Sequence, residues 1–138
     1  PLLLQDGLPA LWDARARRSE ALLAAGEAAG CRRFSRRPSP AVAALRVPAG
    51  VDAPAVVAVM ARRGVRIAGG QDATKPFLIR PSALGWLDDV DVLGIAATLE
   101  AALREVGAEV PHGASVAAAA RVLDALDASD QATVASAT

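Results

Sequence analysis

Apolar residues recur at steps of three and four along three stretches of the chain, the spacing that places them on one face of an α-helix. The first stretch, residues 6–30, is also rich in Ala, Leu, Arg and Glu, which are good helix formers. The second, 52–63, begins at Asp52, and the third, 88–106, begins at Asp88; aspartate is a favoured cap at helix N-termini. The pattern therefore predicts three amphipathic helices.

Shorter apolar runs bounded by Gly and Pro lie between these helices and predict β-strands. They cover residues 31–35, 41–47, 64–68 and 77–80. The last two runs are close in sequence, so we expect them to form a hairpin-like pair whose long tip spans residues 69–76.

The end of the chain is dominated by alanine. Residues 114–126 predict a weakly amphipathic helix, and residues 129–138 carry too little bulk to anchor themselves, so we expect them to fray. The sequence thus divides into a small domain over residues 1–110 and an Ala-rich tail over 111–138.

The order of predicted elements indicates an α+β fold. A chain of 138 residues is long enough for one hydrophobic core but not for two. Strands separated by single helices and short connections favour a small, mostly antiparallel sheet with helices packed on one face. This architecture carries many different activities, so the fold alone predicts no function.

Composition excludes several classes of function. Lys plus Arg and Asp plus Glu number 15 each, so the chain lacks the net positive charge expected of a nucleic-acid-binding protein. No apolar run approaches the length of a membrane span. The one cysteine, Cys31, is expected to be a packed apolar residue, and a chain with a single cysteine fits the cytoplasm.

Candidate catalytic and metal-binding groups are few. The one histidine, His112, adjoins a proline in a predicted surface linker, so no nucleophile–histidine arrangement can be argued. Asp88, Asp89 and Asp91 are better explained as charges favoured at a helix N-terminus than as metal ligands. We therefore predict no catalytic residue and no metal site.

A cluster of four arginines follows the first predicted helix: Arg32, Arg33, Arg36 and Arg37. It could bind an anion or nucleic acid, but Phe34 is the only aromatic residue among them. A solvated loop or a salt-bridged contact with another subunit is the favoured interpretation.

The segment around Arg80 is the strongest candidate for a binding site. The pair Gly69 and Gly70 follows a predicted strand and lets the backbone turn tightly or approach a ligand. Arg80 ends the next strand, and a guanidinium on a rigid support can hold a carboxylate through two parallel hydrogen bonds. The alternative is that Arg80 pairs with an aspartate at the sheet edge.

Several landmarks make the chain resemble the C-terminal small domain of the class V pyridoxal-phosphate aminotransferases, the alanine–glyoxylate and serine–pyruvate transaminase type. The resemblance covers residues 7–106. Its landmarks are Gly-Leu-x-x-x-Trp at 7–12 followed by Arg15, Val-Pro-x-Gly at 47–50, and Gly69-Gly70, Arg80 and Gly85 at the family's spacing. The chain departs from the family at Ala16, which follows Arg15, and at residues 81–83, which follow Arg80.

The resemblance implies that Arg80 grips the α-carboxylate of a small amino acid or 2-oxo acid, while the Gly69-Gly70 tip closes over the site. It also implies a homodimer, and a separate large domain that carries the catalytic lysine and binds pyridoxal phosphate. Lys75, the one lysine of this chain, does not match the Schiff-base position. We therefore expect a fragment that binds no cofactor and is inactive alone.

Two alternatives remain at this point. The chain could be a non-catalytic module that binds a small carboxylate or mediates dimerisation. Within the family, a desulfurase-type member would need a reactive cysteine on a mobile loop, and Cys31, which follows a helix, fits that requirement poorly.

Overall fold

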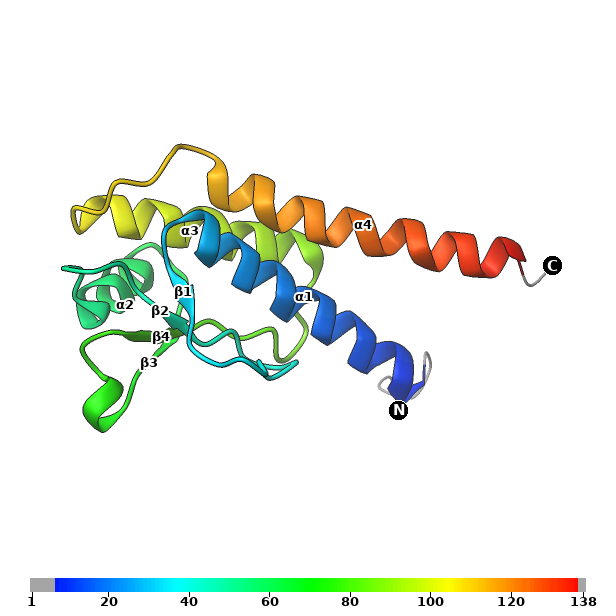
Figure 1. Ribbon diagram of the computed structural model, residues 1–138, viewed down its shortest axis with the longest axis horizontal. Coiled ribbons are helices and arrows are strands. Elements are labelled where there is room, and N and C mark those ends of the chain that lie inside the picture. Colours follow the sequence, from blue (N-terminus) through cyan, green and yellow to red (C-terminus); the bar gives the residue numbers. More distant parts are fainter. Residues whose placement is uncertain (1–6, 137–138) are drawn as a thin grey trace.

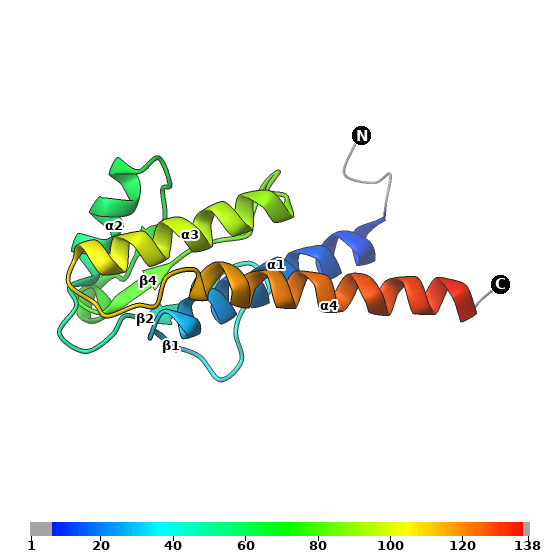
Figure 2. The ribbon, with the colours of Figure 1, turned by 90° about the horizontal axis from the view of Figure 1, so that it is seen from above.

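The computed structural model describes the backbone of residues 7–136 and the side chains through residue 125. Its elements follow one another in the order α1 (Leu8–Ala28), β1 (Arg32–Arg33), β2 (Leu45–Arg46), α2 (Ala53–Arg62), β3 (Ala68–Gly69), a 3-10 helix (Asp72–Thr74), β4 (Leu78–Arg80), α3 (Asp89–Glu105) and α4 (Ala114–Ser136). The helices lie on one side of the small sheet, which confirms the predicted α+β class (Figures 1 and 2).

The sheet is antiparallel throughout, with strand order β1-β2-β4-β3. Leu45 lies opposite Ile79 and both are completely buried, so this pair faces the helices. Because side chains alternate along a strand, Arg80 and its cross-strand partner Ala68 lie on the opposite face. β4 is therefore a central strand that ends in a residue on the open face of the sheet.

The predicted strand over 64–68 is wrong for its first four residues, since β3 begins only at Ala68. The backbone before Ala68 completes the end of α2 instead. Gly64 has a φ of 89°, and the N–H of Val65 donates to the carbonyl of Met60 at 3.0 Å. This is the bonding that closes a helix at a left-handed glycine. The other three strands were predicted in the right places but are shorter than expected.

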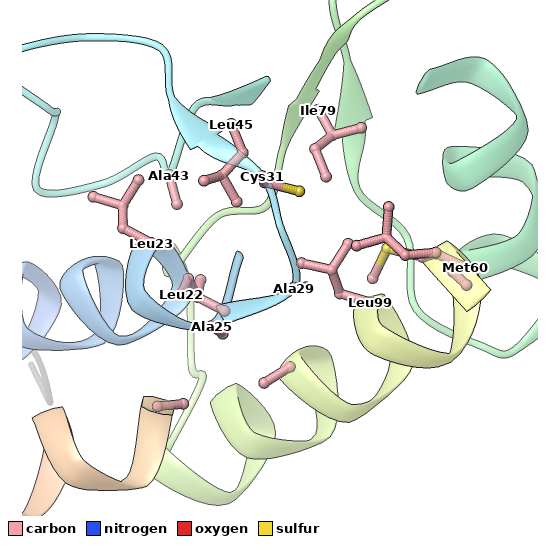
Figure 3. Close-up of a cluster of buried hydrophobic side chains, with 14 of the residues drawn as sticks. Leu22, Leu23, Ala25, Ala29, Cys31, Ala43, Leu45, Met60, Ile79 and Leu99 are labelled. Atoms are coloured by element: carbon pink, nitrogen blue, oxygen red, sulfur yellow. The ribbon is translucent and has the colours of Figure 1, made fainter. Parts of the chain in front are cut away.

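The hydrophobic core lies between the sheet and the helices (Figure 3). Leu22 of α1, Met60 of α2 and Leu99 of α3 meet Leu45 and Ile79 of the sheet there, and each is at most 1% exposed. At about 25 cal/mol per Å² of apolar surface removed from water, this shared core is the main stabilising contribution to the fold.

The helix caps read from the sequence are confirmed. The N–H of Ala55 donates to the Asp52 carboxylate at 3.1 Å, at the start of α2. At α3, the N–H of Asp91 donates to Asp88 and the N–H of Asp88 donates to Asp91, which forms a reciprocal capping box. Asp89 pairs with Arg18 of α1 at 2.8 Å and so ties these two helices together.

Glu100 of α3 fixes the start of α4. Its buried carboxylate accepts hydrogen bonds from the N–H groups of Gly113 and Ser115, at 2.8 and 3.0 Å, and from Arg104. A carboxylate is favoured at this position because the first N–H groups of a helix have no partner within the helix.

α4 extends to Ser136, past the predicted end at residue 126 and through most of the segment that we expected to fray. Alanine has the highest helix propensity, and no Gly or Pro interrupts this segment. Ala119 and Leu123 of α4 belong to the core, so the helix packs with α1 and α3 rather than lying apart. Residues 1–6 and 137–138 lie outside the described residues, and the division of the chain at residue 110 stays a prediction.

Candidate functional site

Arg80 is half-buried at the end of β4, and its side chain is fixed in place by one hydrogen bond. Its Nε donates to the carbonyl of Gly69 at 2.8 Å. The two terminal nitrogens make no hydrogen bond or ion pair with the residues that the structure describes. The alternative of an ion pair between Arg80 and an aspartate therefore finds no support among residues 7–125. A guanidinium held by Nε keeps its terminal edge available for two parallel hydrogen bonds to a carboxylate.

The Gly69-Gly70 tip lies beside Arg80 and turns tightly. The N–H of Gly70 donates to the carbonyl of Leu78 at 2.7 Å, and a Cβ at Gly70 would lie 2.4 Å from the carbonyl oxygen of Thr74. Only glycine fits at that position. Gln71 and Thr74 then exchange two hydrogen bonds, which hold the tip as a compact turn.

A cavity of about 580 Å³ opens beside Arg80. Three segments enclose the cavity: residues 64–67 before β3, the chain that follows β4, and the exposed side of α3. The Ala68–Arg80 pair lies at the end of the sheet next to it. Six large apolar side chains line the cavity: Val65, Ile67, Leu84, Leu87, Val90 and Ile95. The volume falls within the range typical of small-molecule sites.

Sequence reasoning missed this cavity. Val65 and Ile67 were assigned to a strand, and Ile95 to the core-facing side of a helix. The one available signal was Gly94, a glycine inside the most regular predicted helix, which costs about 1 kcal/mol relative to alanine. In the structure Gly94 lines the cavity.

The four-arginine cluster is not one site. Arg33 faces α1 and pairs with Glu20 and Glu27, and these carboxylates raise the pKa of its guanidinium above the ordinary arginine value. Arg46, which is not part of this cluster, forms a cation–π contact on the open face of the sheet. Its guanidinium lies 3.8 Å from the centre of the Phe77 ring. An ion pair within the chain thus accounts for Arg33, while Arg32 is exposed at the edge of the sheet.

Lys75 does not fit a cofactor that needs a lysine. It is exposed at the end of the 3-10 helix, on the tip between β3 and β4. A pyridoxal-phosphate site requires a lysine for the Schiff base and an acidic or basic group that contacts the pyridine nitrogen. Lys75 is not among the residues that line the cavity beside Arg80.

Cys31 and His112 occupy the positions expected of them. Cys31 is buried among core residues (Figure 3), and burial raises the pKa of its thiol to about 12. A thiol with that pKa is not a reactive nucleophile, so a desulfurase-like role for Cys31 is not supported. His112 is exposed.

Within the described part of the chain, no group of three or more His, Cys, Asp or Glu residues could hold a metal ion. Among the same residues, no helix is both long and apolar enough to cross a membrane.

Comparison with curated proteins identifies a relative by sequence. The chain is 36% identical over 126 residues to a protein from Synechococcus sp. (strain PCC 6716) named "Soluble hydrogenase, small subunit". The match covers 88% of this chain but only 33% of that protein. The chain therefore spans about a third of the length of this curated relative. No protein-family profile matches the chain.

Two solved structures share the fold closely. Ureidoglycine-glyoxylate aminotransferase from Bacillus subtilis superposes with a TM-score of 0.82 at 28% identity, covering 89% of this chain and 33% of that enzyme. Pyridoxamine-pyruvate aminotransferase from Mesorhizobium loti gives the same TM-score and identity, covering 90% of this chain and 33% of that enzyme. In both cases the similar region covers about a third of a longer protein.

Proposed function

Because the chain is homologous to the small domain of the class V pyridoxal-phosphate-dependent aminotransferases, we propose that it is the substrate-gripping domain of a transaminase. The reaction moves an amino group between a small amino acid and a 2-oxo acid. Glyoxylate and pyruvate, which appear in the names of the two structural relatives, are both small 2-oxo acids.

In this proposal Arg80 binds the α-carboxylate that amino-acid and 2-oxo-acid substrates share. The observation that carries it is the state of the guanidinium, whose Nε is held by Gly69 while its terminal nitrogens have no described partner. The Gly69-Gly70 tip supports Arg80 through this hydrogen bond and closes one side of the site.

The large domain that completes the enzyme supplies the lysine and binds pyridoxal phosphate, which acts as an electron sink. We propose that the 138-residue chain alone forms no Schiff base and catalyses no transamination. Reduction with borohydride in the presence of pyridoxal phosphate, followed by intact-mass analysis, tests this. A stoichiometric adduct on Lys75 would contradict it.

We also propose a cytoplasmic homodimer, with exposed apolar residues of α1 in its interface. Trp12 is 64% exposed and Leu8 is 47% exposed. Sedimentation of the chain and of the Trp12→Ala variant measures whether these residues support association. If the chain stays monomeric at all concentrations, the dimer requires the large domain or does not form.

The role of Arg80 is tested by titrating the ¹⁵N-labelled chain with pyruvate and following amide and guanidinium signals. We expect shifts at Arg80 and Gly69, and at least tenfold weaker binding in the Arg80→Gln variant because the ion pair is lost. Arg80→Lys should retain part of the affinity, since it keeps the charge but not the planar geometry. Arg121→Gln, on the exposed face of α4, is the matched control.

Unchanged pyruvate binding in Arg80→Gln would overturn the proposed function. The alternative of a pure dimerisation module predicts no pyruvate binding at all, together with concentration-dependent association. The two measurements therefore separate the two functions.

A further inference from the structure

The cavity beside Arg80 combines an apolar interior with two arginines, Arg66 and Arg80. Val65, Ile67 and Ile95 are only partly buried, although each packs against the core on one side. At the rim, Val90 is 75% exposed and Leu84 is 48% exposed. Apolar side chains gathered around an opening of this kind mark a place where an apolar group binds.

The charges at the cavity favour a carboxylate ligand. Asp91 is the only acidic residue in the lining, and one of its carboxylate oxygens already accepts the N–H of Asp88 at 3.0 Å. Arg80 and Arg66 are the cations of the lining. A ligand with one carboxylate and one aliphatic end matches both parts of the cavity.

We propose that this cavity holds the aliphatic side chain of a substrate whose carboxylate is bound by Arg80. One of the two substrates is then an amino acid or 2-oxo acid with an extended or branched apolar side chain, while the other is small, as proposed above. This inference rests on the proposed role of Arg80 and adds the part of the molecule that determines specificity. The cavity volume accommodates a side chain of this size, and each buried methylene strengthens binding several-fold.

Gly94 is the position that keeps the cavity open. It lies in the middle of α3, where alanine would be a better helix former, and a Cβ placed on it meets no atom within 4 Å. A leucine at this position would extend into the cavity without disturbing the helix. The Gly94→Leu substitution therefore fills the apolar part of the cavity without changing Arg80.

The test uses three probes and the complete 138-residue chain, with ¹³C-methyl and ¹⁵N spectra recorded during titration. 4-Methylpentanoate carries both the carboxylate and the branched tail, acetate carries only the charge, and 4-methylpentanamide carries only the tail. We expect 4-methylpentanoate to bind at least tenfold more tightly than acetate, and to shift the methyl signals of Val65, Ile67 and Ile95. The amide should bind at least tenfold more weakly than the acid.

The Gly94→Leu variant should bind 4-methylpentanoate no more tightly than acetate, while its affinity for acetate stays that of the unmodified chain. Ala97→Leu, an exposed position of the same helix outside the cavity, is the matched control and should leave both affinities unchanged. Far-UV circular dichroism confirms that both variants fold.

The outcomes separate this inference from the proposed function. If acetate and 4-methylpentanoate bind equally and both depend on Arg80, the carboxylate site stands and the apolar subsite is refuted. If the amide binds as well as the acid and Arg80→Gln has no effect, the cavity is an apolar docking surface and both proposals fail.

Discussion

Replacing Gly26 of α1 with alanine tests how the helices pack on the sheet. Helix propensity alone predicts stabilisation by about 1 kcal/mol, because glycine weakens a helix interior. The structure predicts the opposite sign. A Cβ at Gly26 would lie 2.3 Å from Cδ1 and 2.8 Å from Cδ2 of Leu45, which is completely buried, so any shift of this side chain must displace other core residues.

The expected magnitude follows from these two contributions. Inserting a methyl group into a filled core costs roughly 1–3 kcal/mol, and the close contact with Leu45 puts Gly26 in the upper part of that range, about 2–3 kcal/mol. Subtracting the gain of about 1 kcal/mol in helix propensity leaves a net loss of about 1–2 kcal/mol in the free energy of unfolding. This is a large fraction of the stability of a small domain.

Urea denaturation followed by far-UV circular dichroism measures this loss. Gly94→Ala is the matched control because a Cβ there meets no atom within 4 Å, so it should stabilise the chain by about 1 kcal/mol. In a Leu45→Ala background the clash is removed, and Gly26→Ala should then be neutral or stabilising. If Gly26→Ala stabilises the unmodified chain as Gly94→Ala does, α1 does not pack on β2 as described.

Three further substitutions or conditions test other parts of the structure. Burial alone would raise the pKa of Glu100, but Arg104 and two backbone N–H groups outweigh it and lower the pKa, so Glu100→Gln should cost about 2 kcal/mol near neutral pH. This difference should persist above the unfolded glutamate pKa of about 4.3 and shrink as pH falls through the lower folded value. Cys31 should resist iodoacetamide at pH 8 until urea unfolds the chain, since burial raises its pKa to about 12; rapid labelling of the folded chain would contradict its burial. Asp52→Ala should destabilise the chain by about 1 kcal/mol in the same urea assay, while an unchanged midpoint would show that the cap is not needed.

Local signals were sufficient for most of the fold. The helix caps at Asp52 and Asp88 are short-range features, and a hydrogen bond between residues three positions apart can be read directly from spacing. The length of α4 was underestimated because apolar bulk was taken as the requirement for order. Alanine-rich sequence with a buried anchor at Glu100 forms a long helix instead.

The candidate site was only partly predictable. Arg80 and the glycine pair were found because their residue types and spacing match a known family, and the backbone need for Gly70 is confirmed by its contact with Thr74. The cavity could not be predicted because it depends on the distance between residues 64–67 and α3. These segments are separated in sequence, and their spacing is set by tertiary packing rather than by any local pattern.

Several departures from ordinary sequence rules lie around the cavity beside Arg80. A predicted strand fails at residues 64–67, a glycine interrupts α3 at Gly94, and two of the six exposed large apolar residues in the described part of the chain, Leu84 and Val90, lie here. All four features line the same cavity as Arg80. A sequence usually specifies its fold consistently, and local inconsistencies are expected where binding requires them. The closure of α2 at Gly64 explains the missing strand, but packing does not explain Gly94, because an added Cβ there meets no atom within 4 Å and alanine is the better helix former. If the cavity binds a ligand as proposed, Gly94 is the position at which the chain gives up helix stability for that binding.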